Sequence, residues 1–200
     1  PNIERLVNRL LDDRVAQSGM ELKEEFAHPI PATIISEMLG IPENDRGMFA
    51  KLSNNIILYG NDLQFGNDEK AEAACKSFDA YLLQLFQQKR KTPKDDLISA
   101  LIETQATSDH LDEEELLHNI RLLFIAGHET TVNLICNALV ALHKNPSQMS
   151  LLKQNPSLMS SAVEEFVRFD SSVQRLPRIA QKNVTIGNEK ILKGQTVICM

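Results

Sequence analysis

The sequence predicts a mainly α-helical protein with a small β portion near its C-terminus. Over most of residues 2–169, apolar residues recur every three to four positions, which is the spacing of amphipathic helices. From Arg175 onward, short apolar runs alternate with glycine-containing turns, which is the pattern of short strands. The sequence shows no internal repeat and no linker. We therefore expect one domain, or part of one, over residues 1–200, with a helical core in 1–170 and short β segments in 175–200.

The helices expected before the centre of the chain are bounded by residues that start or stop helices. Gly19 and Gly40 each follow an apolar periodic run, and Pro42 stands at a first helical position, where proline is favoured. The expected helices are Asn2–Ala16, Ala32–Leu39, a helix from Ile41-Pro42 to about Leu58, Glu69–Lys91 and Asp95–Glu103. A loop over Tyr59–Asp68 and a polar link over Thr104–Leu111 are predicted from their polar and glycine-rich composition.

The longest helical pattern runs from Asp112 to His143 and organises the rest of the chain. Asp112 with Glu115 three positions later fits a capping box. A helix of this length spans roughly 48 Å. Its middle interrupts the apolar run with the residues Ala126-Gly127-His128-Glu129-Thr130-Thr131. Glycine in a helix interior costs about 1 kcal/mol relative to alanine, and a threonine hydroxyl can bond the carbonyl one turn earlier. Such local conflicts tend to mark functional sites.

Two asparagine–proline pairs and several glycines mark the elements that follow. Asn145-Pro146 and Asn155-Pro156 each predict an N-cap followed by proline at the first helical position. The two helices run to about Lys153 and over Ser157–Phe169. Val184–Ile191 is read as two strands around a Gly-Asn turn, followed by a turn at Lys193-Gly194 and a strand over Thr196–Met200.

Composition excludes several classes of protein. Acidic residues outnumber basic ones, 27 to 21, which argues against a general nucleic-acid surface. No window approaches 18 uncharged apolar residues, so no membrane span is expected. The three cysteines, Cys75, Cys136 and Cys199, are too sparse for a disulfide framework and are expected to be small core hydrophobes in a reducing, cytoplasmic setting. The opening without Met and the ending within a strand-like run lead us to expect a fragment.

Structural interpretations of the unusual residues remain open. Glycine and threonine in a long helix often permit close packing, and Glu129 could be solvated. Glu165 and Arg168 are three apart on one helix and can form a surface ion pair. A metalloprotease reading of His128-Glu129 fails, because position 132 is Val132 where a second histidine is required.

Three motifs, in order, resemble those of the cytochrome P450 family, the haem-thiolate monooxygenases. The run Ala126–Thr131 resembles the family's oxygen-activating signature. Glu165-Phe166-Val167-Arg168 resembles its Glu-x-x-Arg motif, and Leu176-Pro177-Arg178-Ile179-Ala180 resembles the segment whose arginine holds a haem propionate. The sequence is similar in type to the soluble bacterial members of the family. The resemblance implies a fragment of the cytochrome P450 fold built around a long central helix.

The resemblance also implies roles for individual residues. Thr130 would hydrogen-bond the bound oxygen, and Glu129 would link it to solvent for proton delivery. The haem would contact Ala126 and Gly127, with Arg178 on a propionate, while Glu165 and Arg168 would form a buried structural pair. The expected substrate-pocket residues are Leu122, Ile125, Val173 and Gln174. No metal ligand is expected in this chain, because none of its cysteines has the family's glycine-rich context, and the axial cysteine is expected beyond Met200.

The implied activity is a haem-dependent insertion of one oxygen atom of O2 into an apolar organic substrate. The expected cofactor is haem, and the expected partners are O2 and an electron donor of the ferredoxin or flavodoxin type. This activity would belong to a longer parent protein, and the 200 residues alone are expected to be inactive. The alternatives are an all-helical protein that binds an apolar ligand without chemistry, and a degenerate, non-catalytic fragment.

Overall fold

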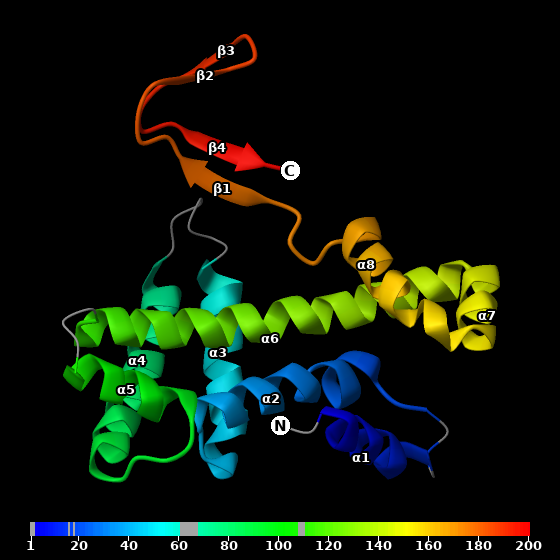
Figure 1. Ribbon diagram of the computed structural model, residues 1–200, viewed down its shortest axis with the longest axis horizontal. Coiled ribbons are helices and arrows are strands. Elements are labelled where there is room, and N and C mark those ends of the chain that lie inside the picture. Colours follow the sequence, from blue (N-terminus) through cyan, green and yellow to red (C-terminus); the bar gives the residue numbers. More distant parts are fainter. Residues whose placement is uncertain (1–2, 16, 18, 61–67, 108–110) are drawn as a thin grey trace. The chain divides into compact units, whose positions relative to one another are not determined.

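A computed structural model describes residues 3–15, 17, 19–60, 68–107 and 111–200 (Figure 1). The chain divides into two compact units, Pro1–Cys136 and Asn137–Met200, which are described here one at a time. The mainly helical architecture with a small β portion near the C-terminus confirms the fold class expected from the sequence. That residues 1–200 form a single domain stays a prediction.

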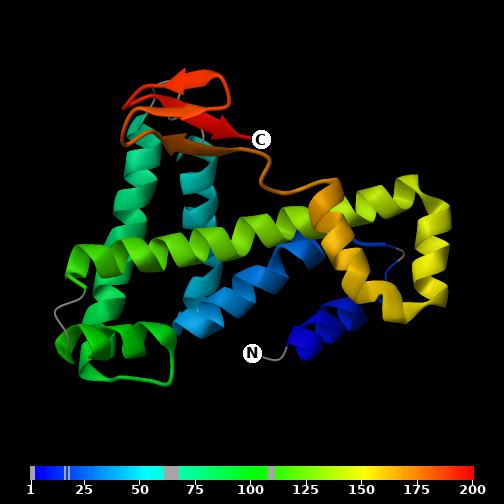
Figure 2. The ribbon, with the colours of Figure 1, turned by 45° about the horizontal axis from the view of Figure 1, so that its top comes forward.

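All secondary-structure elements among the described residues of the first unit are helical. Its elements are α1 (Ile3–Val15), the π-helical turn η1 (Lys23–Ala27), α2 (Pro29–Leu39), the 3-10 turn η2 (Glu43–Asp45), α3 (Arg46–Gly60), α4 (Asp68–Lys91), α5 (Leu97–Thr107) and the first part of α6 (Glu113–Lys144). Helices α3 and α4 lie side by side, and α6 passes across both (Figures 1 and 2).

The core of this unit is built around three phenylalanines whose rings contact one another. The ring centroids of Phe49 and Phe78 lie 4.3 Å apart, and the ring of Phe124 meets that of Phe49 edge-on at 4.4 Å. All three side chains are fully buried. Aromatic pairs in these geometries add roughly 1 kcal/mol each to the free energy of burial. They fix α3, α4 and α6 against one another and so position the centre of α6.

Helix ends lie where the sequence predicted them when a capping residue or a glycine fixes the local backbone. The capping box is confirmed, because Asp112 N–H donates to Glu115 Oε2 at 3.0 Å and Glu115 N–H donates to Asp112 Oδ1 at 2.7 Å. Gly40 ends α2 in the left-handed region, at φ 72°. Helix α2 begins at Pro29, three residues earlier than expected. Helix α5 covers Leu97–Thr107 and so continues through Thr104, where the polar link was expected to begin. Most of the predicted 59–68 loop, residues 61–67, lies outside the described residues.

The second unit consists of the end of α6, three further helical elements and four short strands. These are α7 (Pro146–Gln154), η4 (Pro156–Leu158), α8 (Met159–Phe169), β1 (Leu176–Ile179), β2 (Val184–Ile186), β3 (Glu189–Ile191) and β4 (Thr196–Cys199). Strand β1 pairs with β4 and β2 with β3, both antiparallel. Gly187, at φ 61°, and Asn188 form the two-residue turn between β2 and β3, as the sequence predicted.

The two asparagines before prolines stand at the expected N-cap positions, but neither side chain bonds the helix that follows it. Asn145 Nδ2 donates to Ala141 O at 2.9 Å, and Asn155 Nδ2 donates to Leu151 O at 3.1 Å. Each side chain therefore turns back and satisfies a carbonyl at the end of the preceding helix, where four such acceptors lack partners. The prolines do occupy the first helical positions.

Helix α6 is the one described helix that is long and apolar enough, by length and composition, to cross a membrane. A core helix of a soluble protein meets the same criterion. Six of its residues are buried in the first unit, while most of its apolar stretch is not buried in the structure.

Candidate functional site

The central part of α6 has one buried face and one exposed apolar face. The buried stripe consists of Leu116, Leu117, Ile120, Phe124, His128 and Val132. Away from it, Leu122 is 63 % exposed, Ala126 is exposed, and Ile125 and Glu129 are half-buried. Residues 122, 125, 126 and 129 are spaced three and four apart, so they share one face of the helix. The helix thus brings together Leu122, Ile125, Ala126 and Glu129 as an apolar surface that ends in a carboxylate.

The two threonine hydroxyls next to this surface bond backward along the helix, as expected from the sequence. Thr130 Oγ1 donates to Ala126 O at 2.8 Å, and Thr131 Oγ1 to Gly127 O at 3.5 Å. Helix α6 stays continuous through both positions. A hydroxyl oxygen keeps two lone pairs when it donates, so Thr130 can still accept a hydrogen bond.

Gly127 is not required by helix packing. A Cβ added at this position would lie 3.4 Å from Ile35 Cδ1, which is an ordinary van der Waals contact. Alanine would favour the helix by about 1 kcal/mol. Close packing against Ile35 therefore does not explain the glycine, and both Ala126 and Gly127 are exposed to solvent.

The carboxylate of Glu129 has a nearby polar partner on the same helix. Asn133 Nδ2 donates to Glu129 Oε1 at 3.3 Å. Because Glu129 is half-buried, its carboxylate is neither sequestered in the core nor fully solvated. That position suits a group that exchanges protons between solvent and a less polar surface.

The structure also places His128, which the sequence marked only as a rejected metal-ligand candidate, in the core. Its side chain is fully buried, its ring lies 4.5 Å edge-on from that of His28, and neither of its ring nitrogens has a hydrogen-bond partner among the described residues. Burial lowers the pKa of His128 to about 4, and the positive charges of His28 and Lys23 act in the same direction. Its four-residue spacing from Phe124 and Val132 was the signal that could have revealed it.

The paired motif of the second unit forms an exposed ion pair. Arg168 Nε and Nη2 both donate to the Glu165 carboxylate at 2.7 Å, and these contacts lower the pKa of Glu165 and raise that of Arg168. The side chain of Glu165 is 54 % exposed and that of Arg168 is 70 % exposed. The pairing agrees with the sequence, whereas the burial implied by the family resemblance is not found in this chain.

Arg178 lies on β1 with its guanidinium exposed. Its one described hydrogen bond runs from Nη1 to Pro177 O at 2.9 Å. An arginine has five N–H donors arranged in a planar fork, so the others can bind a carboxylate. Val173 is exposed, and Gln174 Nε2 lies 3.4 Å from Asp170 Oδ1.

The cysteines are all free thiols. Cys75 and Cys136 are half-buried, and burial raises the pKa of Cys136. Cys199 is exposed, so its prediction as a core residue was wrong. It lies on β4 of the two-stranded β1–β4 sheet. The apolar residues of this strand are mostly exposed, because no other described residues pack over them.

The long helix α6 and the three motifs in order are the features on which the chain can be compared with known sequences. The sequence model of the cytochrome P450 family matches residues 3–200. The chain therefore belongs to the cytochrome P450 family. Homologues in this family are monooxygenases and bind haem.

Two curated relatives show how much of a family member is matched. Cytochrome P450 CYP107DY1 of Priestia megaterium is 39 % identical over 198 residues, which cover 99 % of this chain and 48 % of the relative. Vitamin D(3) 25-hydroxylase of Pseudonocardia autotrophica is 40 % identical over 200 residues, again covering 99 % and 48 %. The chain thus spans about half the length of the curated relatives it matches.

Solved structures agree in fold. P450BioI in complex with acyl carrier protein ligated to hexadec-9Z-enoic acid superposes with a TM-score of 0.91 at 33 % identity, covering 99 % of this chain and 51 % of that one. CYP109E1 from Bacillus megaterium in complex with testosterone gives a TM-score of 0.90 at 30 % identity, covering 99 % and 52 %.

The residues present fit the family's cofactor. The exposed face of α6 is apolar at Leu122 and Ile125. At Ala126 and Gly127 the side chains are small or absent, so a flat ring system can approach the helix backbone there. Arg178 offers an exposed fork of donors for a carboxylate. These two chemistries, apolar contact and carboxylate binding, are those that a haem with its propionates requires.

Proposed function

We propose that this chain provides the central part of a haem-dependent monooxygenase, which inserts one oxygen atom of O2 into an apolar organic substrate. The observation that carries the proposal is the exposed face of α6, where apolar side chains run into the Glu129–Thr130 acid–alcohol pair. Membership of the family supports the reaction class. The printed names of relatives, which include a vitamin D(3) hydroxylase and a testosterone complex, support an apolar substrate.

The haem would be held by groups of two kinds. Ala126 and Gly127 would contact its ring, since they present little side chain. Arg178 would bind a propionate through its guanidinium. The Glu165–Arg168 pair would stabilise the surrounding fold rather than contact the cofactor. When bound, the haem supplies the oxygen-activating chemistry.

Proton delivery would be the task of Thr130 and Glu129. The hydroxyl of Thr130 donates to Ala126 O, and its oxygen can accept a hydrogen bond without losing that contact. A rotation about χ1 would redirect the hydroxyl proton away from the helix. The half-buried Glu129 carboxylate would take up protons from solvent and return Thr130 to its protonated state.

The remaining predicted residues concern the substrate, the electron donor and the compartment. Leu122 and Ile125 would contact the apolar body of the substrate, while Val173 and Gln174 would add one apolar and one polar contact. A ferredoxin or flavodoxin would deliver the electrons. We place the parent enzyme in the cytoplasm, which agrees with three free thiols.

A chimera tests the proposal. Residues 3–200 replace the matched region of the Priestia megaterium relative, and the purified protein is examined for haem content and for the carbon monoxide absorbance of a thiolate-bound haem. Thr130→Ala is compared with the matched control Thr131→Ala, whose hydroxyl bonds the backbone in the same way. We expect Thr130→Ala to lower product formation about a hundredfold with unchanged substrate binding, whereas Thr131→Ala stays near wild type.

Three results would contradict the proposal or a part of it. A folded chimera that takes up no haem would refute the cofactor assignment. A chimera that binds haem and an apolar ligand but forms no product would favour the non-catalytic ligand-binding alternative. Equal activity of the two threonine variants would refute the role of Thr130 alone.

A further inference from the structure

A hollow at the end of α4 is lined by hydrogen-bond donors that the proposed reaction does not use. It lies in the first unit, between the turn after α2, the last turns of α4 and the residues before α5, and has a volume of about 370 Å³. None of its described lining side chains is acidic, so a negatively charged ligand would meet no carboxylate on its walls. The polar lining residues are Gln88, Lys89, Lys91, Thr92 and Lys94.

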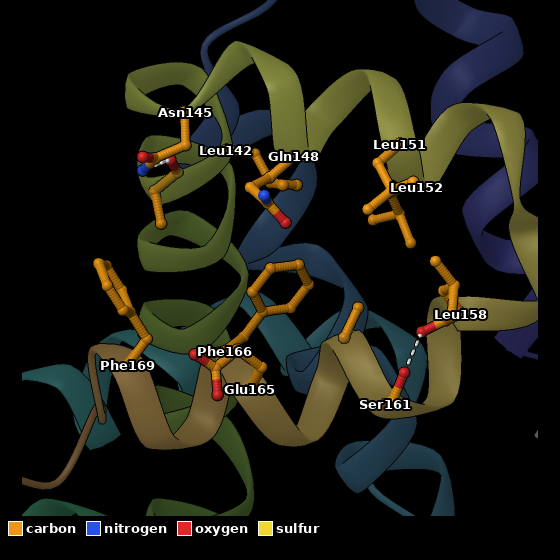
Figure 3. A pocket seen from close by; sticks show the side chains of 12 residues that line it. Leu142, Asn145, Gln148, Leu151, Leu152, Leu158, Ser161, Glu165, Phe166 and Phe169 are labelled. Carbon is orange, nitrogen blue, oxygen red and sulfur yellow. Dashed lines mark hydrogen bonds between the residues drawn. The ribbon is translucent and has the colours of Figure 1, made fainter.

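The hollow of the second unit has a different character. It lies between the end of α6, α7, η4 and α8, and apolar side chains such as Leu142, Leu152 and Phe166 line it (Figure 3). Among its described lining residues Glu165 alone is charged, and that carboxylate is paired with Arg168. This lining offers no cation to a ligand, whereas the hollow beside α4 does.

Positive charge is concentrated at the end of α4. Four of the chain's 21 basic residues, and none of its 27 acidic ones, lie within positions 89–94, although the net charge of the chain is −6. Basic residues in a last helical turn complement the helix dipole, and Arg90 does so while it donates to Glu113 Oε2 at 3.1 Å. Lys91 and Lys94 form no ion pair with any described residue, so their charges are available to a ligand.

The side chain of Lys89 is the fixed part of this hollow. Lys89 is only 4 % exposed, and its ammonium group pairs with the Asp96 carboxylate. Gly40 lets both side chains pack directly against its backbone, because a Cβ at that position would collide with both of them. An ammonium group has three N–H donors, and Asp96 accepts one of them. The other two have no acceptor among the described residues, so they can bind an oxygen atom that enters the hollow.

We propose that this hollow binds the phosphate group of a small soluble molecule. A phosphate monoester carries roughly two negative charges at neutral pH and three terminal oxygens that accept hydrogen bonds. Lys89 would bind one oxygen from its fixed position, Lys91 and Lys94 would supply balancing charge, and the Thr92 hydroxyl would add a donor. The acidic net charge of the chain argues against nucleic acid as the source of the phosphate. This site goes beyond the proposed oxygenase function and does not depend on it.

Equilibrium dialysis of the purified chain against radiolabelled inorganic phosphate in low-salt buffer tests the proposal. We expect saturable binding with a dissociation constant of about 1 mM or lower, because several charged donors line one hollow. Lys91→Gln and Lys94→Gln together should weaken binding at least about tenfold, and each alone should give a smaller loss. Thr92→Val, which keeps every charge, should weaken it about threefold. Lys76→Gln is the matched control, since it removes an exposed lysine of α4 outside the hollow, and should leave binding within about twofold.

A competition experiment identifies the source of the phosphate. Glycerol 3-phosphate should displace the labelled phosphate, whereas glycerol should not. Cosedimentation of the chain with vesicles of phosphatidylcholine and phosphatidic acid, without binding of free phosphate, would identify a lipid headgroup and overturn the proposal.

Two further outcomes would also overturn it. Uptake that does not saturate would show that phosphate is only attracted to the positive charge of the surface. Equal weakening by Lys76→Gln and by the Lys91→Gln and Lys94→Gln pair would show the same. Circular dichroism verifies that each variant is folded, and the single variants and Thr92→Val supply the comparison if the double variant is not. Dialysis requires neither haem nor product formation, so its result is separate from that of the chimera.

Discussion

The buried imidazole of His128 should make the stability of the first unit depend on pH. Its ring is fully buried beside His28, and neither nitrogen has a hydrogen-bond partner among the described residues. A proton added to this ring would place an unpaired charge in the core, near the further positive charges of His28 and Lys23. The folded state therefore favours the neutral ring, and its pKa lies near 4 rather than at the ordinary 6.5.

The direction and the size of the change in folding stability with pH follow from proton linkage. Between pH 6.5 and about 4, the unfolded chain binds a proton at His128 and the folded chain does not, so stability rises with pH in this window. Stability is thus fully present above the unfolded pKa and is lost as the pH falls toward the folded one. A pKa lowered from 6.5 to about 4 corresponds to at most about 3 kcal/mol. Roughly 2 kcal/mol of this is lost between pH 7 and pH 4.5, which is a large part of a typical domain's stability.

Urea unfolding followed by circular dichroism at pH 7, 6, 5 and 4.5 measures this effect. The comparison is between the unmodified chain and His128→Phe, which keeps a planar ring but cannot titrate. We expect the stability difference between the two to change by roughly 2 kcal/mol in favour of the variant as the pH falls. His143→Phe, an exposed position on the same helix, controls for loss of a histidine and should follow the unmodified profile.

One outcome would refute the reasoning. If the unmodified chain and His128→Phe lose stability in parallel from pH 7 to pH 4.5, His128 does not titrate differently in the folded and unfolded states. Its ring would then have a partner in solution, such as a buried water, that accepts its proton.

Two further predictions concern helix ends. Asp112→Ala removes the side chain that accepts the Glu115 N–H, and should cost about 1 kcal/mol of unfolding free energy in urea titration; an unchanged midpoint would show that the cap contributes nothing. Gly40→Ala should cost more than about 1 kcal/mol, because residue 40 has φ 72° and a Cβ there would collide with the Asp96 side chain. Gly47→Ala, in a helix with open space around it, should be neutral or stabilising, and equal effects at both glycines would contradict this account.

Local signals in the sequence predicted the elements that depend on near neighbours. The capping box at Asp112, the Gly40 stop, the Gly187-Asn188 turn and the long α6 each rest on contacts within a few residues, and the structure contains all of them. Asn145 and Asn155 stand at the predicted N-cap positions, but their side chains bond the helix before them. An asparagine between two helices can bond either one, and sequence does not state which carbonyl is free.

The family and the helical class were thus determined by the sequence itself, through periodicity and three motifs in order. The site roles of Glu129, Thr130 and Arg178 stay predictions. Only the tertiary structure decided that Leu122 is exposed while His128 is buried, although both lie in the same apolar run of α6. The physical reason is that helical spacing defines faces, but the neighbours that cover a face come from distant parts of the chain. Phe49 and Phe78 cover one side of α6, and Leu122 on another side is left exposed.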